Sequence, residues 1–377
     1  MKYYICEGKP DGEYNAQSKA RNDANYILEK NGYKSFFIPS KDGVQTKKIL
    51  KFKQLIVYKQ NYNVWKKYIK KLQKNDIIVI QYPILNSMMN FEKIIEYCNK
   101  LGIITVILIH DMDSLRFSHI PRKAREDKMV LNNAKYIIAH NESMKRQLLN
   151  MENKEEKIVE LEIFDYLVKE NIKDKENNKN NKNNKNNKNN KNNKNNNIII
   201  AGNLSKEKSA YIYQLKNLLN VNFNLYGKGY KPEDYTENIK YKGAFLPEEI
   251  PNKLEGSFGL VWDGTSIETC NGAMGEYLRY NNPHKTSLYL ASQIPVIVWE
   301  DSAISSFVKN NKIGIIVKSL SEINIKLTNL KDTEYFEMIK NTKTISEKLR
   351  NGHYLTTALK NVEKKINEKL KNEKISN

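Results

Sequence analysis

The sequence predicts an α/β protein made of two doubly wound parallel-sheet domains that face each other across a cleft. Apolar runs of four to seven residues recur along the chain, and the run at 104–110 is an example. These runs lack the alternation of a half-solvated strand, so we expect strands that are buried on both faces. Helical patterns separate the runs, which indicates βαβ units. A polar tract at 177–197 divides the runs into two groups.

The first group predicts six strands and three helices. The strands are expected at 2–7, 35–39, 76–85, 104–110, 134–140 and 157–164. The helices are expected at 16–31, 64–73 and 91–100. Gly32 and Gly102 follow the first and third of these patterns, and glycine just past the last turn is a common end of a helix.

The second group repeats this alternation. Its strands are expected at 197–202, 222–227, 239–245, 256–262, 295–299 and 314–317. Its helices are expected at 209–219, from Pro283 onward, at 302–310 and at 355–371. The helix from Pro283 must be short because Pro295 cannot continue it.

These patterns set the expected domain boundaries. We expect an N-terminal domain at 1–168, a linker at 169–197 and a second domain at 198–340. The last part, 341–377, is expected to hold a basic helix that packs back on the first domain. The tract at 177–197 consists only of asparagine and lysine, so it cannot bury a core and is expected to be a disordered tether.

Composition narrows the class of protein. The net charge of +20 suits an acidic partner, such as a phosphorylated metabolite, an anionic membrane surface or nucleic acid, but no recognised nucleic-acid module is present. The three cysteines are far apart, so we expect neither a zinc site nor disulfides, which favours a reducing compartment. No signal-peptide pattern and no run of transmembrane length is found. We therefore expect a cytoplasmic protein, compatible with peripheral contact to the membrane.

The most unusual motif is the Pro-His-Lys at the start of the short helix that begins at Pro283. Lys285 lies in the first turn of this helix, where a cation opposes the helix dipole. An anion bound at the helix start would make this arrangement favourable, because free N–H groups there bind phosphate. Lys285 can alternatively extend into solvent, and Thr286 and Ser287 can be ordinary capping residues.

Ligands of open parallel sheets bind beyond the carboxyl ends of the strands, and other strand ends of the second half also carry suitable residues. They are Asn203, Lys206, Tyr226, Gly227 and Asp263. Small residues let a ligand approach the backbone, and the tyrosine ring can line a base. Together with Pro283, His284 and Lys285 they predict a nucleotide diphosphate site, although each glycine alone is explained equally well by a turn.

In the first half, His110, Asp111 and Asp113 directly follow a predicted buried strand. Three interpretations remain open for the two carboxylates. One of them can take a proton from an acceptor hydroxyl as a general base. The Asp-x-Asp can hold a divalent metal through hard oxygen ligands. Both can also be helix-capping or loop acids, with His110 hydrogen-bonded in the core.

The turn after the first strand holds Asn15, Ala16, Ser18 and Arg21. It lacks the Gly-x-Gly-x-x-Gly of dinucleotide binding, which argues against an NAD or FAD enzyme. The chain also has no P-loop sequence, which argues against a P-loop NTPase.

Several of these segments together resemble the bacterial galactofuranosyltransferase and glucosyltransferase family, which includes O-antigen and capsule β-1,6-galactofuranosyltransferases and the second-sugar glucosyltransferase of serine-rich adhesins. The segments are YNAQSKARNDANYILEKNGYK, HDMDSLR, AGNLSK, NLYGKG, PHKTSLYLASQIPVIVW and SAISSFVKNNKIGIIV. They occur in the order of the family and cover the chain except for the Asn/Lys tract and the basic tail.

The resemblance implies a GT-B fold with two Rossmann-like domains and transfer of a hexose from a UDP-sugar to a saccharide acceptor, without a cofactor or metal. It implies that residues 203–206, Tyr226 and 283–287 contact UDP, and that Ala16 and its neighbours approach the donor from the other domain. It implies a role for Asp111 or Asp113 as base or acceptor contact. The acceptor would be lipid-linked or protein-linked, at the inner face of the membrane, and the protein can be a homo-oligomer.

Two alternatives remain open on the same architecture. One is a metal-dependent transferase that uses Asp111 and Asp113. The other is a protein that binds nucleotide sugars or stabilises a partner without catalysis. Sensitivity to a chelator tests the first alternative, and turnover of the donor tests the second.

Overall fold

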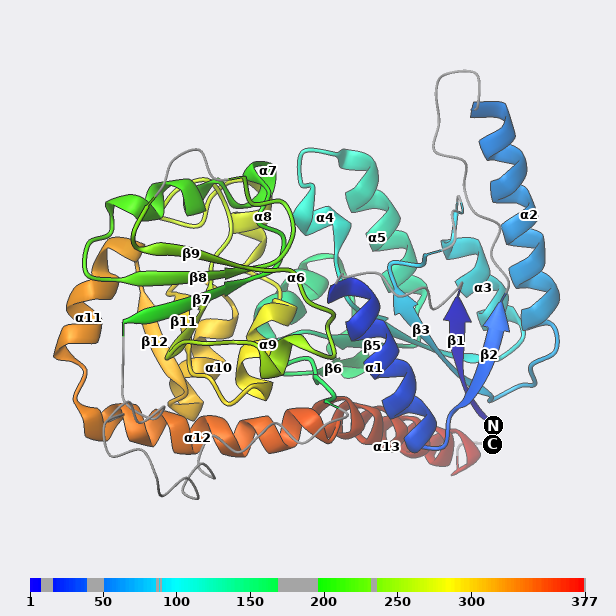
Figure 1. Cartoon of the computed structure of the whole chain (residues 1–377). Coiled ribbons are helices and arrows are strands. Elements are labelled where there is room, and N and C mark those ends of the chain that lie inside the picture. Colours follow the sequence, from blue (N-terminus) through cyan, green and yellow to red (C-terminus); the bar gives the residue numbers. More distant parts are fainter. Residues whose placement is uncertain are drawn as a thin grey trace. The chain divides into compact units, whose positions relative to one another are not determined.

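The structure is a computed structural model of the chain, and it describes residues 1–7, 16–38, 51–85, 88, 90–168, 196–231 and 236–375. The chain divides into two compact units (Figure 1). Unit 1 comprises the described residues within 1–12, 21–163 and 354–377, and unit 2 those within 13–20 and 164–353. Most of the predicted Asn/Lys tether, residues 177–195, lies outside the described residues, and its last residue, Asn197, begins a strand.

Unit 1 is built on a six-stranded sheet with the order β2-β1-β3-β4-β5-β6. Its strands are β1 (Lys2–Glu7), β2 (Lys34–Ile38), β3 (Ile77–Tyr82), β4 (Ile104–Ile109), β5 (Tyr136–Ala139) and β6 (Ile158–Glu160). Every neighbouring pair is parallel. The central strands are buried along almost their whole length, as expected for a sheet that is covered on both faces.

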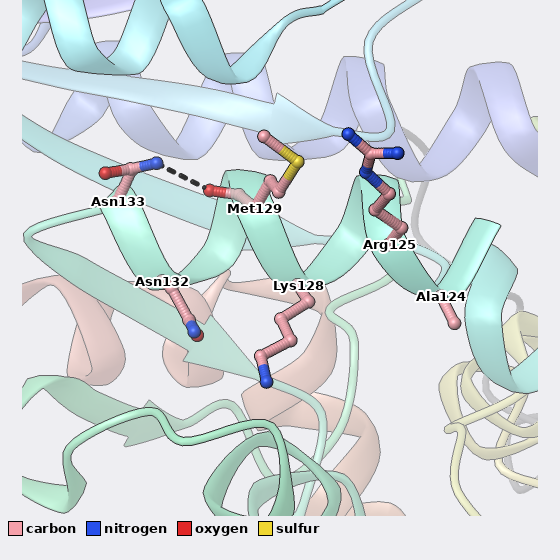
Figure 2. A pocket seen from close by; sticks show the side chains of 6 residues that line it. All are labelled: Ala124, Arg125, Lys128, Met129, Asn132 and Asn133. Atoms are coloured by element: carbon pink, nitrogen blue, oxygen red, sulfur yellow. Dashed lines mark hydrogen bonds between the residues drawn. The ribbon is translucent and has the colours of Figure 1, made fainter. Parts of the chain in front are cut away.

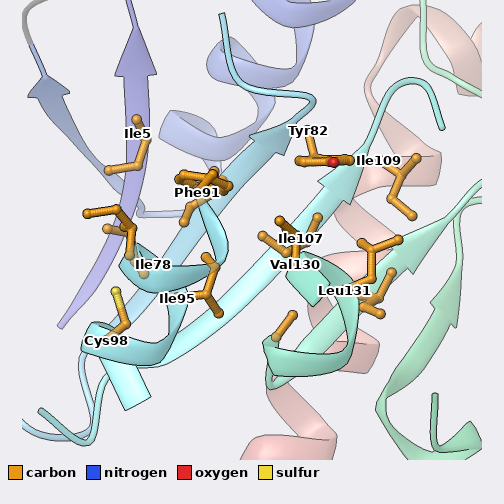
Figure 3. Packing of buried hydrophobic residues seen from close by; sticks show 14 of the residues in the cluster. Ile5, Ile78, Tyr82, Phe91, Ile95, Cys98, Ile107, Ile109, Val130 and Leu131 are labelled. Atoms are coloured by element: carbon orange, nitrogen blue, oxygen red, sulfur yellow. The ribbon is translucent and has the colours of Figure 1, made fainter. Parts of the chain in front are cut away.

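Helices α2, α3, α5 and α6 supply the core on one face of this sheet. They span Lys51–Ile69, Glu92–Lys100, Pro121–Asn133 and Glu142–Asn150. Trp65 of α2 and Phe91 before α3 meet edge to face at 5.2 Å between ring centroids, and Ile78 and Ile107 of the sheet belong to the same buried cluster (Figure 3). This packing fixes the strands whose ends carry the polar residues described below.

The remaining helices of unit 1 are α1 (Ala16–Lys30), of which the part from Arg21 belongs to this unit, the short α4 (Asp113–Arg116) and α13 (His353–Ile375). Helix α13 returns to the start of the chain, where Glu363 accepts hydrogen bonds from Lys2 and Tyr33. Asn31 also donates to Thr356 at 3.0 Å. The C-terminal helix therefore belongs to the same compact unit as the first strand.

Unit 2 repeats the architecture with the sheet order β12-β11-β10-β7-β8-β9. Its strands are β7 (Asn197–Ala201), β8 (Asn222–Tyr226), β9 (Ile239–Gly243), β10 (Phe258–Val261), β11 (Val296–Trp299) and β12 (Gly314–Val317). All neighbours are again parallel. Two doubly wound parallel sheets are thus confirmed.

The helices of unit 2 are α7 (Lys206–Ser209), α8 (Gly272–Tyr277), α9 (His284–Ala291), α10 (Ile304–Asn311), α11 (Ile323–Asn329) and α12 (Asp332–Arg350). Residues Ala210–Asn217, predicted as an α-helix, form 3-10 turns after α7. The predicted helix at 64–73 begins earlier, at Lys51. Sequence analysis did not predict α5, α6, α8, α11 or α12.

Two expectations from composition can be compared with the structure. The three cysteines are free thiols, and Cys98 and Cys270 are buried. Among the described residues, no helix combines the length and the hydropathy needed to cross a bilayer.

The ends of β7 and β8 approach so closely that glycine is required at Gly227. Its φ is +142°, and an added Cβ would lie 1.8 Å from the carbonyl oxygen of Gly202. Gly202 also has a positive φ, of +138°, but a Cβ there would meet nothing within 4 Å. Substitution of Gly202 would therefore test backbone strain alone, whereas substitution of Gly227 would test backbone strain together with a steric clash.

We predict that Gly202→Ala costs about 1–2 kcal/mol of unfolding free energy, because only the backbone is strained. Gly227→Ala should cost roughly 3 kcal/mol or more, because the carbonyl of Gly202 must also move. Urea denaturation of both variants measures the difference. Equal losses would contradict the close approach of the two strand ends.

Candidate functional site

Each sheet has one point where the strand order reverses, and ligands of doubly wound sheets bind beyond the strand ends at that point. In unit 2 the reversal lies between β7 and β10, and in unit 1 between β1 and β3. We therefore examined the residues that follow these strands, treating each unit by itself.

In unit 2, Gly202 follows β7, and Trp262 and Asp263 follow β10. The space beside the Cα of Gly202 is open, so a ligand can approach this backbone. Gly227 and Gly229 differ from it, because an added Cβ would meet Gly202 and Ser205, respectively. These two glycines are needed because the loops pack closely against each other. They therefore have a structural role, which the sequence had left open as an alternative to ligand binding.

Lys285, in the first turn of α9, reaches these strand ends. Its Nζ donates to the Trp262 carbonyl and to Oδ1 of Asp263, both at 2.9 Å. The lysine side chain is 16% exposed and the aspartate side chain 9% exposed, so Lys285 does not extend freely into solvent. Asp263 is an anion that offsets the unfavourable position of this cation at a helix start. An ammonium group has three donors, and two of them are used in these bonds.

His284, the first residue of α9, is held by aromatic rings. Its ring lies 5.1 Å from that of Tyr166 and 6.2 Å from that of Phe164, centroid to centroid. Burial lowers the pKa of His284 to about 3; the positive charge of Lys19 contributes, and a hydrogen bond with the Asp165 backbone opposes the shift. The imidazole is therefore neutral at physiological pH.

Three buried polar atoms near the start of α9 have no hydrogen-bond partner in the described part of the chain. They are Oδ1 of Asn281, Nε2 of His284 and Oγ1 of Thr286. Buried polar atoms are rarely left unpaired in native proteins. The first N–H groups of a helix also lack partners within the helix. The start of α9 thus offers several polar groups to a ligand.

Other residues predicted for this site have structural roles. Tyr226 is 1% exposed, and its hydroxyl accepts a hydrogen bond from the Glu255 N–H at 3.0 Å. Its ring has no open face on which a base can stack, so the predicted lining of a base by Tyr226 is not supported. Ser287 donates to the Phe164 carbonyl at 2.6 Å. Pro283 precedes the helix, and its carbonyl accepts from the Thr286 N–H.

Asn203 lies on the exposed turn that follows β7, and Lys206 is the exposed first residue of α7. Oδ1 of Asn203 accepts a hydrogen bond from the Ser205 N–H at 2.9 Å. The ammonium of Lys206 lies 5.4 Å from the centre of the Tyr213 ring. Both side chains are accessible at the strand end where the sheet order reverses.

The start of α1 also belongs to unit 2, up to Ala20. Ala16 and Ser18 lie in the first turn of α1, and Asn15 lies outside the described residues. Lys19 donates to the Leu167 carbonyl at 2.7 Å and lies over the Tyr166 ring. Through Tyr166, this helix start is linked to His284.

In unit 1, Arg21 occupies the reversal point. It is 6% exposed and donates to the backbone carbonyls of Gln81 and Pro83 at the end of β3. Burial lowers the pKa of Arg21, whereas the carboxylates of Glu7 and Asp111 oppose the shift. Arg21 thus supplies a buried positive charge beside the strand ends.

His110 follows β4 and has a defined partner. Its Nε2 lies 2.7 Å from Oε1 of Gln81, which can only accept, so this nitrogen carries the proton. The Gln81 amide in turn donates to Oδ1 of Asn25 at 2.7 Å. This chain of hydrogen bonds holds the imidazole at the carboxyl ends of the strands β3 and β4.

The two aspartates of the Asp-x-Asp contact different cations. Asp111 accepts from Arg116 at 3.3 Å, and Asp113 accepts from Lys123 at 2.8 Å. Burial alone would lower the pKa of Lys123, but the hydrogen bond and charge of Asp113 raise it. Among the described residues, no group of three His, Cys, Asp or Glu side chains is arranged to hold a metal ion.

Sequence analysis missed several residues that shape these sites. Asp127 of α5 accepts from the Tyr82 hydroxyl and from the Ser114 N–H, and it lies in a helix that was not predicted. Lys19, Phe164 and Tyr166 had no distinctive pattern around them. Asp263 stood out only as an acid after a strand, and its pairing with Lys285 depends on the fold.

A pocket of about 450 Å³ lies along one side of α5, away from the strand ends (Figure 2). It is lined by Ala124, Arg125, Lys128, Met129, Asn132 and Asn133. Asn133 donates to the Met129 carbonyl of the same helix, and Lys128 pairs with Glu152. It contains none of the predicted site residues, and we assign it no part in the site.

Comparison with known proteins agrees with this arrangement. Residues 2–163 match the N-terminal domain of the glucosyltransferase 3-like family model, and residues 198–362 match the C-terminal domain. The chain is 34% identical over 296 residues to the β-1,6-galactofuranosyltransferase WbbI of Escherichia coli K12, covering 77% of this chain and 80% of that protein.

Solved structures show the same fold. Sucrose-phosphate synthase from Thermosynechococcus elongatus has a TM-score of 0.64 at 11% identity, covering 97% of this chain and 99% of that one. HepE from Anabaena in complex with UDP has a TM-score of 0.55 at 13% identity, covering 99% and 100%. At such identities the likeness is one of fold alone.

The two doubly wound parallel sheets have the architecture of the GT-B class, and the family and relative matched above show that the chain is a glycosyltransferase. Within that class, the chain belongs to the glucosyltransferase 3-like family, and the resemblance found in the sequence is confirmed.

The neutral, buried His284 predicts a specific pH dependence of stability. Its folded pKa lies below the unfolded value of about 6.5, so below that pH the unfolded chain binds the proton and the folded chain does not. The unfolding free energy should therefore fall as the pH drops from about 6.5 toward 4.

Replacing the imidazole should remove this contribution. In His284→Gln, the loss of unfolding free energy between pH 7 and pH 4.5 should be about 2 kcal/mol smaller than in the wild type. Urea denaturation at the two pH values measures it. An identical pH dependence in both proteins would mean that His284 is protonated in the folded state.

Proposed function

We propose that this chain transfers a hexose, galactofuranose or glucose, from a UDP-sugar to a saccharide acceptor without a metal ion. The observation that carries the proposal is the start of α9 at the reversal point of unit 2. Lys285 and three buried polar atoms that lack a partner among the described residues lie at or next to this helix start, and Gly202, which follows the neighbouring strand β7, has open space beside its backbone. The relatives named above support the sugar chemistry, because WbbI is named for galactofuranose and the family for glucosyl transfer.

The diphosphate of the donor would lie against the start of α9. Negative charge grows on this group as the bond to the anomeric carbon breaks, and groups that are already in place stabilise it where it develops. Asp263 and the Trp262 carbonyl hold the ammonium of Lys285 in position, and its third N–H is directed to phosphate. The N–H groups of the helix start add to this stabilisation.

The remaining groups at the donor site fit a polar ligand. Oγ1 of Thr286 would donate a hydrogen bond to an oxygen of the donor, whereas the unprotonated Nε2 of His284 would accept one from a sugar hydroxyl. Asn203 would contact the donor from the turn after β7, and Lys206 from the start of α7. We propose that Lys285, Lys206 and the N–H groups of the helix start together stabilise the diphosphate in place of a metal ion.

The acceptor hydroxyl adds to the anomeric carbon, and UDP leaves with the electron pair of the broken bond. The hydroxyl proton must go to a base, and we assign this role to Asp111. Its partner Arg116 lies at 3.3 Å, whereas Lys123 holds Asp113 at 2.8 Å. Asp113 also sits in the first turn of α4, where a carboxylate stabilises the helix. Ser18, Arg21 and His110 would orient the sugars.

The acceptor is proposed to be a lipid-linked or protein-linked saccharide at the inner face of the membrane. The net charge of +20 supports an anionic surface nearby. Self-association as a homo-oligomer is part of the proposal, and light scattering of the purified chain tests it.

Thermal stabilisation by UDP, with and without EDTA, tests the donor site. At 100 times its Kd, a ligand stabilises the folded state by about 2.7 kcal/mol. We expect a rise in melting temperature that EDTA does not change. A rise that EDTA abolishes would overturn the metal-independent mechanism.

Variants locate the stabilisation by UDP. Lys285→Met should abolish most of it, but this change also leaves Asp263 unpaired. The double variant Lys285→Met/Asp263→Asn removes both charges together and should likewise not respond. Lys340→Met, at an exposed position of α12, is the matched control and should respond as the wild type does. A full response of both Lys285 variants would contradict the assignment.

Turnover of UDP-sugars distinguishes the two aspartates and tests for catalysis. Asp111→Asn should lower kcat by roughly 100-fold or more, because the acceptor proton loses its base. Asp113→Asn should lower it much less and mainly reduce stability through the lost contact with Lys123. The reverse order would make Asp113 the base. Absence of turnover with any UDP-sugar and saccharide acceptor, with UDP binding intact, would favour a non-catalytic binding protein.

A further inference from the structure

The segment of the sequence that contains helix α2 carries an unusual concentration of positive charge. Between Gly43 and Asn75 the sequence contains ten lysines and no acidic residue. The net charge of the whole chain is +20, so this short segment accounts for much of the excess. Many positive charges close together create a local positive potential, which attracts an anionic surface.

Among the described side chains of α2, those buried in the core of unit 1 belong to its second half. Trp65 and Ile69 are fully buried in the hydrophobic cluster of unit 1, and Leu72, just past the helix, is buried in it as well. Tyr68 meets Phe36 of β2 at 5.9 Å between ring centroids. These contacts anchor the helix against the sheet.

Helix α2 is much longer than the strand it packs against, and its first half extends past that strand. The helix has 19 residues and the neighbouring β2 has 5, so at 1.5 Å per helical residue against about 3.3 Å per strand residue it extends well past the strand. In Figure 1 the first half of α2 projects beyond the carboxyl ends of β1 and β2. Leu55 and Ile56, in this half, are 51% and 44% exposed.

Lysines continue the same exposed side of the helix. Lys59, Lys67 and Lys70 are exposed. Lys59 follows Leu55 and Ile56 by four and three residues, Lys67 follows Lys59 by eight, and Lys70, just past the end of α2, follows Lys67 by three. These spacings place all five along one side. None of the three lysines has an acidic partner within the described ranges. The helix thus presents an aliphatic pair followed by unpaired cations.

We propose that this side of α2 docks on a membrane that contains anionic lipids. Aliphatic side chains enter the boundary between headgroups and acyl chains, and lysines attract anionic headgroups. Nucleic acid would use the lysines but would leave Leu55 and Ile56 exposed to water. A lipid surface matches both kinds of side chain, and this combination favours it over an acidic protein or nucleic acid.

The position of α2 also suggests where a lipid-linked acceptor would bind, and this part of the inference rests on the function proposed above. The projecting end of α2 lies at the carboxyl edge of the sheet of unit 1, the edge that also carries His110 and Asp111. Docking through α2 would bring that edge toward the membrane surface. A lipid-linked acceptor would be presented there.

Vesicle sedimentation of the full chain tests the proposal directly. The wild type should bind phosphatidylcholine vesicles that contain phosphatidylglycerol and should bind pure phosphatidylcholine far more weakly. High salt should weaken the binding, because exposed charges are screened. Equal binding to both kinds of vesicle, or none to either, would overturn the proposal.

Variants assign the contact to α2. Lys59→Glu/Lys67→Glu/Lys70→Glu should weaken partitioning into anionic vesicles by roughly 100-fold or more. Leu55→Ser/Ile56→Ser should weaken it by roughly tenfold at unchanged charge. The matched control Lys360→Glu/Lys369→Glu/Lys371→Glu changes the same charge on exposed positions of α13 and should retain most of the binding. Equal losses in both triple variants would show a response to net charge only and contradict a docking face on α2.

Two further readouts separate this proposal from its competitors. Stabilisation by UDP should be the same in the α2 variants and the wild type, so failure of the donor site and failure of docking are distinguishable. A labelled DNA oligonucleotide should bind more weakly than anionic vesicles, and its binding should not depend on Leu55 or Ile56. Tight DNA binding without vesicle binding would replace the lipid partner by nucleic acid.

Discussion

The rest of the structure depends on the requirement that parallel strands be buried on both faces. A sheet covered on both sides has little open backbone except at the ends of its strands, so polar chemistry gathers there. In each unit the strand order reverses once and opens a place where a ligand can reach these ends. Gly202, Lys285 and Asp263 in unit 2, and Arg21 and His110 in unit 1, occupy these two places.

Electrostatics at the start of α9 shows how the fold tolerates an unfavourable charge. A lysine in the first turn of a helix is destabilising by itself. Asp263 and the Trp262 carbonyl offset this cost and also restrict where the ammonium can be. Because burial keeps His284 neutral, the site gathers one cation, its counter-ion and several uncharged polar groups. Such a set suits a leaving group whose negative charge increases during the reaction.

In unit 1, too, the charged side chains at the strand ends lie next to charges of opposite sign. The buried Arg21 lies near the carboxylates of Glu7 and Asp111, and the two aspartates of the Asp-x-Asp pair with separate cations. Each aspartate thus has a cation of its own, which suits the proposed transfer of a single proton to one of them.

The sequence by itself determined the fold class, the order of the strands along the chain, the family and the segments that carry the site, because burial on two faces and helix ends leave local patterns. It could not show that Tyr226 is buried, that Gly227 serves packing, or that Asp263 is the partner of Lys285. Those facts depend on contacts between residues far apart in the chain, which only the tertiary structure brings together. Helices such as α5 were missed for the same reason, since tertiary packing rather than local pattern stabilises them.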